Sequence, residues 1–238
     1  MPLKHPIIIW LRQDQRLSDH PALAAAEASK RKVIPCYVLD TRDTRPWRPG
    51  GASRWWLYHS LSEIGQRIRE QGGDLLLKHG DPVSIITELA LEVGASAVYW
   101  SRAVEPHCRR DETALASTLE AHGIGSEGFA GNLLFAPEMI QNRSGAPFRV
   151  FTPFWKHCLA NGSKMRAPTG PVSPEFSTDL PDGDVLDDWG LLPTHSNWAA
   201  GLKETWQPGE AAGQALLHKF VEKAPRYNTH RNFPAEDA

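Results

Sequence analysis

The sequence has little cysteine. Its three cysteines, Cys36, Cys108 and Cys158, are widely spaced and form no Cys-x-x-Cys pair. An odd number at such spacing fits a reducing cytoplasm better than a disulfide framework or a cysteine-based zinc site. No apolar run approaches the length of about 18 residues that a membrane-spanning helix needs. Residues 1–11 also lack the length and the small-residue cleavage site of a signal peptide. These absences predict a soluble, cytoplasmic protein with no membrane partner.

Common catalytic motifs are missing as well. The chain contains no Gly-x-Ser-x-Gly, no His-Glu-x-x-His, no Walker loop, and no Gly-x-Gly-x-x-Gly after its first apolar run. The 10 histidines are scattered, so we expect no metal site. The net charge of −2 argues against a basic arm that binds nucleic acid. No nucleophile–base pair stands out either, so the residues predict no catalytic group in this chain.

The first 130 residues alternate between strand patterns and helix patterns. Strands are expected at 7–11, 33–39, 74–79, 95–100 and 124–129, although the last of these matches strand propensity poorly. Helices are expected from Pro21, over 53–71, from Pro82 to Gly94, and over 111–122. Such alternation predicts an α/β fold with a five-stranded parallel, doubly wound, Rossmann-like sheet. A chain of 238 residues has room for this domain and part of another.

Residues 6–23 are the stretch around which the rest is organised. The uninterrupted apolar run at 7–11 suits a strand that is covered on both faces. It delivers Arg12, Asp14, Arg16 and Asp19 to the carboxyl edge of the sheet, where open α/β folds bind ligands. The structural alternative is that Asp14 and Arg16 simply pair with each other and brace the turn.

A crevice is expected where the strand order reverses. If the fourth strand lies beside the first, Arg12 faces Ser101, Arg102 and Glu105 across it. Tryptophans at positions 10, 47 and 100 flank such a crevice, which could hold an aromatic cofactor. The tryptophans at 10 and 100 lie inside strands, however, and their position favours a role in the core.

One connection is far longer than a doubly wound fold needs. Residues 40–52 begin at Asp40 and read DTRDTRPWRPGGA, where about 2 to 6 residues are usual. Arg42, Arg45 and Arg48 lie beside Trp47, and Arg54 follows at the helix start. This set would suit a planar anionic ligand through bidentate pairing and stacking. The alternative is a solvated lid that only covers the sheet edge.

The second half has a different character. Of the 19 prolines, 11 lie beyond residue 130, and residues 161–195 read as a connector without helical or strand period. A helical pattern returns over 210–224. A lone helix at the end of a connector cannot bury its apolar face by itself. That face is therefore either folded back onto the α/β domain or covered by something outside this chain.

A set of short motifs, in a specific order and spacing, runs along the whole chain. They are Trp10-Leu11-Arg12-x-Asp14-x-Arg16-Leu17-x-Asp19-x-Pro21-Ala22-Leu23, Ala52-Ser53-Arg54-Trp55-Trp56-Leu57, Gly80-Asp81-Pro82, Glu105-Pro106, Gly131-Asn132-Leu133-Leu134, 148–155 (FRVFTPFW), Trp206-Gln207-Pro208-Gly209-Glu210, and Tyr227 with Arg231-Asn232-x-Pro234. Through them the chain resembles the photolyase/cryptochrome family nearly end to end. The likeness is strongest to bacterial cyclobutane pyrimidine dimer photolyases.

The resemblance implies three parts. Residues 1–130 correspond to an α/β antenna-chromophore domain, 131–196 to an interdomain connector, and 197–238 to the start of a helical FAD-binding domain that is truncated here. The parent protein is then a monomeric flavoprotein that repairs UV-damaged DNA by light-driven electron transfer from reduced FAD. Matched by position, Tyr227 contacts FAD and Arg231 grips DNA phosphate. This chain alone would lack catalysis and would self-associate through its exposed helix.

The antenna and the exact function stay open. Arg12, Asp40, Arg54, Arg102 and Glu105 are the candidate antenna residues. The resemblance implies that the antenna is methenyltetrahydrofolate or 8-hydroxy-5-deazaflavin. Some members of the family use a flavin instead. A cryptochrome photoreceptor is one rival interpretation. The other is a free-standing nucleotide-binding α/β protein whose tail folds back, which predicts that the helix at 210–224 is buried against residues 1–130.

Overall fold

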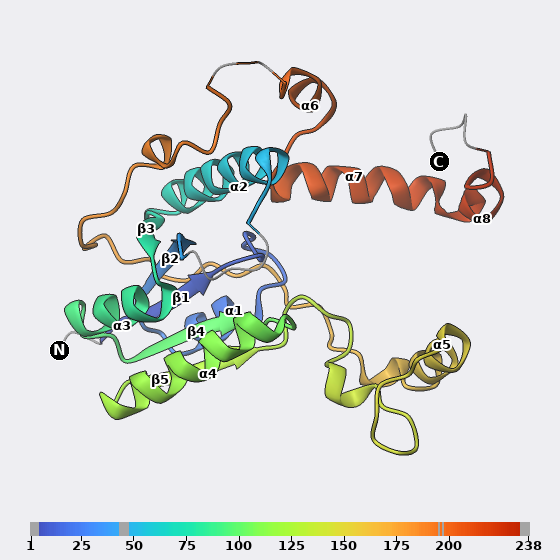
Figure 1. Cartoon of the computed structure of the whole chain (residues 1–238), viewed down its shortest axis with the longest axis horizontal. Helices are drawn as coiled ribbons and strands as arrows, with labels where there is room; N and C mark the ends of the chain where they lie inside the picture. The colour runs from blue at the N-terminus through green and yellow to red at the C-terminus, as the bar shows by residue number, and fades with distance from the viewer. Residues whose placement is uncertain (1–4, 43–47, 195, 197, 234–238) are drawn as a thin grey trace.

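The computed structural model describes residues 5–42, 48–194, 196 and 198–233. Its centre is a five-stranded, all-parallel sheet with the order β3-β2-β1-β4-β5 (Figure 1). The strands are β1 (Ile7–Leu11), β2 (Val33–Asp40), β3 (Leu76–Gly80), β4 (Ala97–Ser101) and β5 (Gly125–Phe129). The predicted fold class is confirmed, and so is the expected pairing of β1 with β4. The strand order therefore reverses between β1 and β4.

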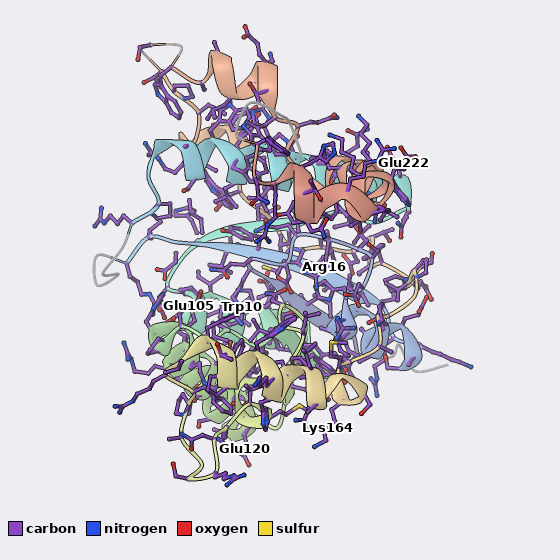
Figure 2. All side chains as sticks on the ribbon, turned by 90° about the vertical axis from the view of Figure 1, so that its right-hand side faces the viewer. Trp10, Arg16, Glu105, Glu120, Lys164 and Glu222 are labelled. Carbon is purple, nitrogen blue, oxygen red and sulfur yellow. The ribbon has the colours of Figure 1, made fainter. Side chains whose placement is uncertain are left out.

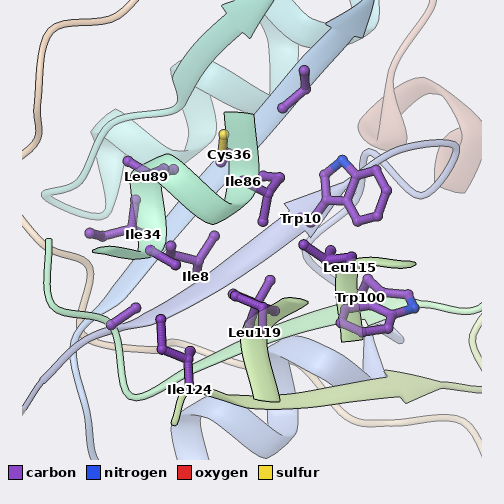
Figure 3. Close-up of a cluster of buried hydrophobic side chains, with 14 of the residues drawn as sticks. Ile8, Trp10, Ile34, Cys36, Ile86, Leu89, Trp100, Leu115, Leu119 and Ile124 are labelled. Atoms are coloured by element: carbon purple, nitrogen blue, oxygen red, sulfur yellow. The ribbon is translucent and has the colours of Figure 1, made fainter. Parts of the chain in front are cut away.

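Helices cover both faces of the sheet. They are α1 (Pro21–Ala28), α2 (Gly51–Glu70), α3 (Pro82–Glu92) and α4 (Pro106–Ala121). Ile8 and Trp10 point to the face covered by α3 and α4, where Leu89 and Leu115 are buried with them (Figure 3). The alternate residues of β1 face α1 and α2, so every residue of this strand is buried. Burial on both faces is why β1 reads as a continuous apolar run rather than an alternating one.

Helix starts follow the capping signals in the sequence. Asp81 accepts a hydrogen bond from the backbone N–H of Ser84, and Pro82 occupies the first turn. At α1 the cap is His20, whose Nδ1 accepts from the N–H of Leu23 at 3.3 Å. The expected start of α4 at residue 111 was late, because Pro106 already opens the helix. Strands β3 and β4 begin two residues later than expected.

Strand β5 forms in spite of its weak propensity. Its glycines weaken that propensity, but they leave space that neighbouring side chains occupy. A Cβ on Gly128 would lie 2.7 Å from Cγ of Arg102 and 2.9 Å from Nε1 of Trp100. A Cβ on Gly125 would lie 3.3 Å from the Cβ of Ala97. Packing against β4 therefore decides the identity of these residues, and tertiary context overrides local preference.

The connector is only partly structured and returns to the sheet. It contains η1 (Pro137–Met139), α5 (Phe151–Ala160), η2 (Gly162–Lys164) and η3 (Leu186–Trp189). Phe176 forms a parallel bridge with Val33 and is buried in the core on the α2 side. The N–H of Asp184 donates to the carbonyl oxygen of Leu77 at 2.8 Å. The connector is thus attached to the α/β domain along the β2 and β3 side.

Gly73 allows this attachment. A Cβ at this position would lie only 2.3 Å from the Cβ of Phe176 and 2.7 Å from its Cγ. We expect Gly73→Ala to lower the free energy of unfolding by about 1–3 kcal/mol, because a well-packed core cannot accept the extra atom. Gly170→Ala is the control, since nothing lies within 4 Å of the added Cβ. Urea denaturation of both variants measures the difference, and equal midpoints would contradict the prediction.

The last helices leave the α/β domain. They are α6 (Ala200–Thr205), α7 (Glu210–Lys223), η4 (Ala224–Arg226) and α8 (Tyr227–His230). Along α7 the large apolar side chains are exposed, with Leu217 at 60% and Phe220 at 39%. Figure 1 shows α7 projecting outward past α2, away from the sheet. The fold-back interpretation predicted a buried helix here, and it is wrong. No helix in the described part of the chain is long and apolar enough to cross a membrane.

Self-association of this chain stays a prediction. Leu216, Leu217, Phe220 and Val221 form an exposed apolar face, and faces of this kind promote association. We expect Leu217→Glu to reduce the weight-average mass in sedimentation equilibrium toward the mass of the monomer. Leu91→Glu on α3 is the control, because Leu91 is an exposed apolar residue outside this face. A parent chain that is monomeric at all concentrations would contradict the prediction.

Candidate functional site

A cavity of about 610 Å³ opens where the strand order reverses. Its lining comes from the carboxyl ends of β1, β2 and β4, the start of α2 and the start of α4. This is the position at which doubly wound sheets bind their ligands. Figure 2 looks from the side to which α5 and α7 project, and it labels two lining residues, Trp10 and Glu105. The predicted crevice is therefore present.

Arg12 lies at the wall of this cavity, directly after β1. Its guanidinium stands 4.4 Å from the ring centroid of Trp10. It also donates to the carbonyl oxygen of Ser101 and pairs with Glu112, whose Oε1 lies 2.5 Å from Nη2. Arg12 thus reaches β4 as expected, but its positive charge is already compensated by a carboxylate from α4. Its contacts support the wall by stacking and hydrogen bonding.

Asp14 is buried beside Arg12, with an exposed fraction of 2%. One carboxylate oxygen accepts from the backbone N–H of Arg12 at 2.8 Å, and the other lies 3.0 Å from Nε2 of His20. Burial alone raises the pKa of Asp14, but the hydrogen bonds from His20 and Arg12 outweigh it and lower the pKa to about 2. Asp14 is therefore ionised at neutral pH.

The expected pair of Asp14 with Arg16 does not form. Arg16 instead donates to the carbonyl oxygens of Asp19 and Gly131, at 3.0 and 2.8 Å from Nη2, and to Oδ1 of Asn132 at 3.0 Å. Both residues brace the loop after β1, as the structural alternative proposed, but through different partners. Asp14 and Asn132 also line the cavity, so the brace supports its rim.

Arg42 is held by three carboxylates at the opposite rim. Its guanidinium lies 2.7 Å from Asp40, 3.0 Å from Asp81 and 2.6 Å from Asp111. The hydrogen bonds to Asp40 and then Asp111 raise the pKa of Arg42. A guanidinium so occupied is not available for an anionic ligand, which is a correction to the predicted arginine-lined loop. Arg45 and Trp47 lie outside the described residues.

Among the described residues that line the cavity, acidic groups outnumber basic ones. Asp40, Glu105 and Asp111 all contribute. Glu105 accepts from Nε2 of Gln13 at 3.4 Å, and hydrogen bonds to backbone N–H groups, its own first, lower its pKa. Ionised carboxylates are hydrogen-bond acceptors only. The lining therefore favours a ligand that presents N–H or O–H donors at this rim.

Two predicted antenna residues lie away from this cavity. On α2, Ser53, Trp56 and Leu57 share the helix face that lines it, whereas Arg54 is exposed and outside the lining. Arg102 follows Ser101 and points to the other face, as successive strand residues do. Its side chain crosses Gly128 and lines a groove between α4 and β5. The structure thus brings together Arg12, Asp40 and Glu105 only.

The predicted FAD and DNA residues lie at the far end of the chain. Tyr227 begins α8, packs against Phe220 with ring centroids 5.3 Å apart, and is 41% exposed. The guanidinium of Arg231 stands 6.0 Å from the centroid of the Tyr227 ring. The two residues are therefore neighbours on one exposed surface, well separated from the sheet in Figure 1.

Sequence reasoning missed several lining or supporting residues. His20 and Glu112 are buried partners of Asp14 and Arg12, and Asp111 completes the cluster around Arg42. Trp56 lines the cavity from α2 and meets Trp206 edge-on at 6.1 Å. Helical spacing from Ser53 to Trp56 is the one signal that could have identified Trp56. The other partners are distant in sequence and carry no local pattern.

The cavity has the composition that an aromatic cofactor needs. Trp10, Tyr37 and Trp56 provide ring surfaces, and the carboxylates provide acceptors. The indole Nε1 of Trp10 is buried without a hydrogen-bond partner among the described residues. Buried polar groups of this kind are normally satisfied, so it is a donor that a ligand could use. In the described part of the chain no cluster of His, Cys, Asp or Glu could hold a metal ion.

The fold is a doubly wound α/β domain with a cavity at the reversal of strand order, the position at which such domains bind ligands. The sequence model of the family described as DNA photolyase matches residues 7–174, and the chain belongs to this family. A deoxyribodipyrimidine photo-lyase of Agrobacterium fabrum is 37% identical over 235 residues, which are 98% of this chain and 48% of that protein. Cryptochrome-2 of Arabidopsis thaliana is 32% identical over 231 residues, covering 94% of this chain and 37% of its own length.

Solved structures agree with these relatives. A bacterial class III photolyase from Agrobacterium tumefaciens superposes with a TM-score of 0.89 at 37% identity, covering 99% of this chain and 48% of that one. The chain spans about half the length of the photolyase relatives that it matches. The predicted family and the predicted relation to photolyases and cryptochromes are therefore confirmed.

Proposed function

We propose that this chain is the antenna-carrying half of a deoxyribodipyrimidine photo-lyase that repairs UV-damaged DNA with light. The observation that carries the proposal is the 610 Å³ cavity at the reversal of strand order, in a chain of this family. The division into an α/β domain (1–130), a connector (131–196) and the start of a helical FAD domain (197–238) belongs to the same proposal. The exposed faces of α5 and α7 support it, because a helical body could cover both.

The antenna would lie against Trp10 and Trp56, with Arg12, Asp40 and Glu105 around its polar edges. When bound, an antenna absorbs near-ultraviolet or blue light and passes the excitation on. The carboxylates would accept hydrogen bonds from ring N–H groups, and Nε1 of Trp10 would donate one. Methenyltetrahydrofolate and 8-hydroxy-5-deazaflavin both present such groups, and the proposal includes either of them.

FAD and DNA enter the proposal through the terminal helices. Tyr227 would contact FAD and Arg231 would contact a DNA phosphate, and both side chains are accessible on one surface. The flavin supplies the electron chemistry, and the protein positions it. We expect no catalytic group from this chain itself. A monomer is the expected state when the helical half is complete.

Two measurements test the proposal. The purified chain is mixed with methenyltetrahydrofolate or with 8-hydroxy-5-deazaflavin and then desalted. It should keep the near-ultraviolet or blue absorbance band of one of the two, at one chromophore per chain. A form extended to the length of the relatives should then split thymine dimers in light and not in darkness. If neither chromophore is retained, the antenna assignment fails. If the extended form binds reduced flavin but repairs nothing in light, the repair function fails.

A cryptochrome photoreceptor is the second candidate, and the 32% identity to cryptochrome-2 favours keeping it. The two candidates differ in the events that come after the absorption of light. A photoreceptor would change its conformation or its partner binding in light without splitting dimers. The repair assay on the extended form therefore separates the two.

A further inference from the structure

The carboxylate of Glu210 is buried in a cluster that joins the first turn of α7 to the α/β domain. Its side chain is 5% exposed. It accepts from the backbone N–H of Leu17 at 2.7 Å and of Ser18 at 2.9 Å. The hydroxyl of Ser18 and the guanidinium of Arg67 on α2 also donate to it. Four donors from two separate parts of the α/β domain thus meet one side chain, which lies 193 residues from Leu17 and 143 residues from Arg67 in sequence.

The balance of forces on Glu210 favours the ionised form. Burial alone raises the pKa of this carboxyl. The hydrogen bonds from Ser18 and Leu17 and the charge of Arg67 outweigh burial, so the net pKa lies below its ordinary value. Hydrogen bonds to an ionised group are roughly twice as strong as neutral ones. The cluster is therefore a strong contact in an otherwise sparse interface.

The remaining contacts of α7 are few. Gly209 precedes the helix with a φ of +114°, and a Cβ there would lie 2.8 Å from Cγ of Glu63. Beyond the first turn, the side chains of α7 are exposed from Ala215 to Lys223. Figure 2 shows α7 projecting with Glu222 at its surface. A helix held at one end takes its direction from that end.

Three of the four donors of the cluster, from Leu17 and Ser18, belong to the loop that forms the cavity wall. Leu17 and Ser18 lie in the segment between β1 and α1, and Arg12, Gln13 and Asp14 of this segment line the cavity. The same segment is braced by Asp14 and His20. The residues that hold the start of α7 are therefore only a few positions along the chain from residues of the cavity wall.

We infer that Glu210 is a positioning residue that fixes the direction of α7 relative to the cavity between β1 and β4. The inference goes beyond the proposed function and does not rest on it, because it needs neither an antenna nor DNA. Without the carboxylate, the sheet stays folded and α7 samples many directions. In Glu210→Gln the side-chain NH₂ would replace one acceptor oxygen and would face N–H donors. The hydrogen bonds of the cluster are then lost, although the shape of the side chain is kept.

Distances between spin labels on α4 and α7 test this inference. Labels are placed by Glu120→Cys and Lys219→Cys in a Cys108→Ser background, since Cys36 and Cys158 are buried. We expect one narrow distance distribution in the parent and broad distributions in Glu210→Gln and Glu210→Ala. Glu222→Gln, an exposed change on the same helix, should leave the distribution narrow.

Amide hydrogen exchange provides the local readout. Exchange at the N–H groups of Leu17 and Ser18 should accelerate by about 10- to 100-fold in the Glu210 variants, because each loses a hydrogen bond to a charged acceptor. Exchange in the central strand β1 should not change. A general loss of stability would accelerate exchange in β1 as well, so this result separates the two causes. Narrow distributions and unchanged exchange in both Glu210 variants would overturn the inference.

A change on the donor side covers the case in which the Glu210 variants do not fold. Ser18→Ala combined with Arg67→Gln removes two donors and leaves Glu210 in place. Broadening of the label distances in this double variant supports the inference. A distribution as narrow as that of the parent overturns it.

Discussion

Asp14→Ala will lower the free energy of unfolding by about 3 kcal/mol. The change removes a buried carboxylate and leaves two donors, the backbone N–H of Arg12 and the ring of His20, without their acceptor. His20 has no exposed surface in the parent, so its ring N–H depends on this carboxylate for an acceptor. Chemical denaturation at neutral pH measures the loss. Glu120→Ala is the control, because Glu120 is exposed.

Asp14 also determines how the free energy of unfolding depends on pH in the acid range. The pKa of Asp14 in the folded protein is about 2, below the ordinary value of 3.8. Its contribution is therefore complete above pH 3.8 and is lost as the pH falls through about 2, and it amounts to about 2 kcal/mol. The pKa of Asp19 is also lowered to about 2, mainly by its hydrogen bond from Arg166. The difference between parent and Asp14→Ala isolates the part due to Asp14. Parallel curves from pH 6 to pH 2 would contradict the assignment.

Ser53→Trp will strongly reduce retention of the proposed antenna. Ser53 is an exposed residue of the first turn of α2 and lines the cavity, so a bulky ring there fills ligand space without disturbing the core. A steric cost of about 1–3 kcal/mol corresponds to a loss of affinity of about 10- to 100-fold. The ratio of chromophore absorbance to protein absorbance after desalting measures it.

A second tryptophan substitution, outside the cavity, is the control for Ser53→Trp. Ser117→Trp places the same side chain on an exposed face of α4, beside the groove between α4 and β5. It should leave the chromophore ratio unchanged. Equal retention by the two variants would show that the chromophore is not bound in this cavity. Equal loss in both would point to a general effect of the added tryptophan.

Periodicity and capping signals were enough to predict the sheet and its helices. The run at β1 and the Asp81-Pro82 start of α3 are local patterns, and each has one straightforward structural reading. The pairing of the fourth strand with the first was supposed from the doubly wound fold class, and the structure has it. β5 was predicted from its place in the alternation, while its glycines are explained only by the contacts of Trp100 and Arg102 with Gly128.

The candidate site was predictable in location and not in its pairings. Asp14 has two nearby candidates, Arg16 and His20, and only the path of the loop decides that His20 is its partner. Arg42 meets Asp111 from a helix that lies 69 residues further along the chain. No spacing rule connects such residues, so the sequence could not show that the charge of Arg42 is compensated by carboxylates.

That ionic cluster has a consequence for polyanions. Among the described residues of this cluster, one guanidinium stands among three carboxylates, which leaves an excess of negative charge, and Glu105 adds to it across the opening. A phosphate backbone that approached this edge would be repelled over roughly a Debye length, about 8 Å in physiological salt. The entrance would therefore stay clear for a small ring compound while nucleic acid is directed to other parts of the surface.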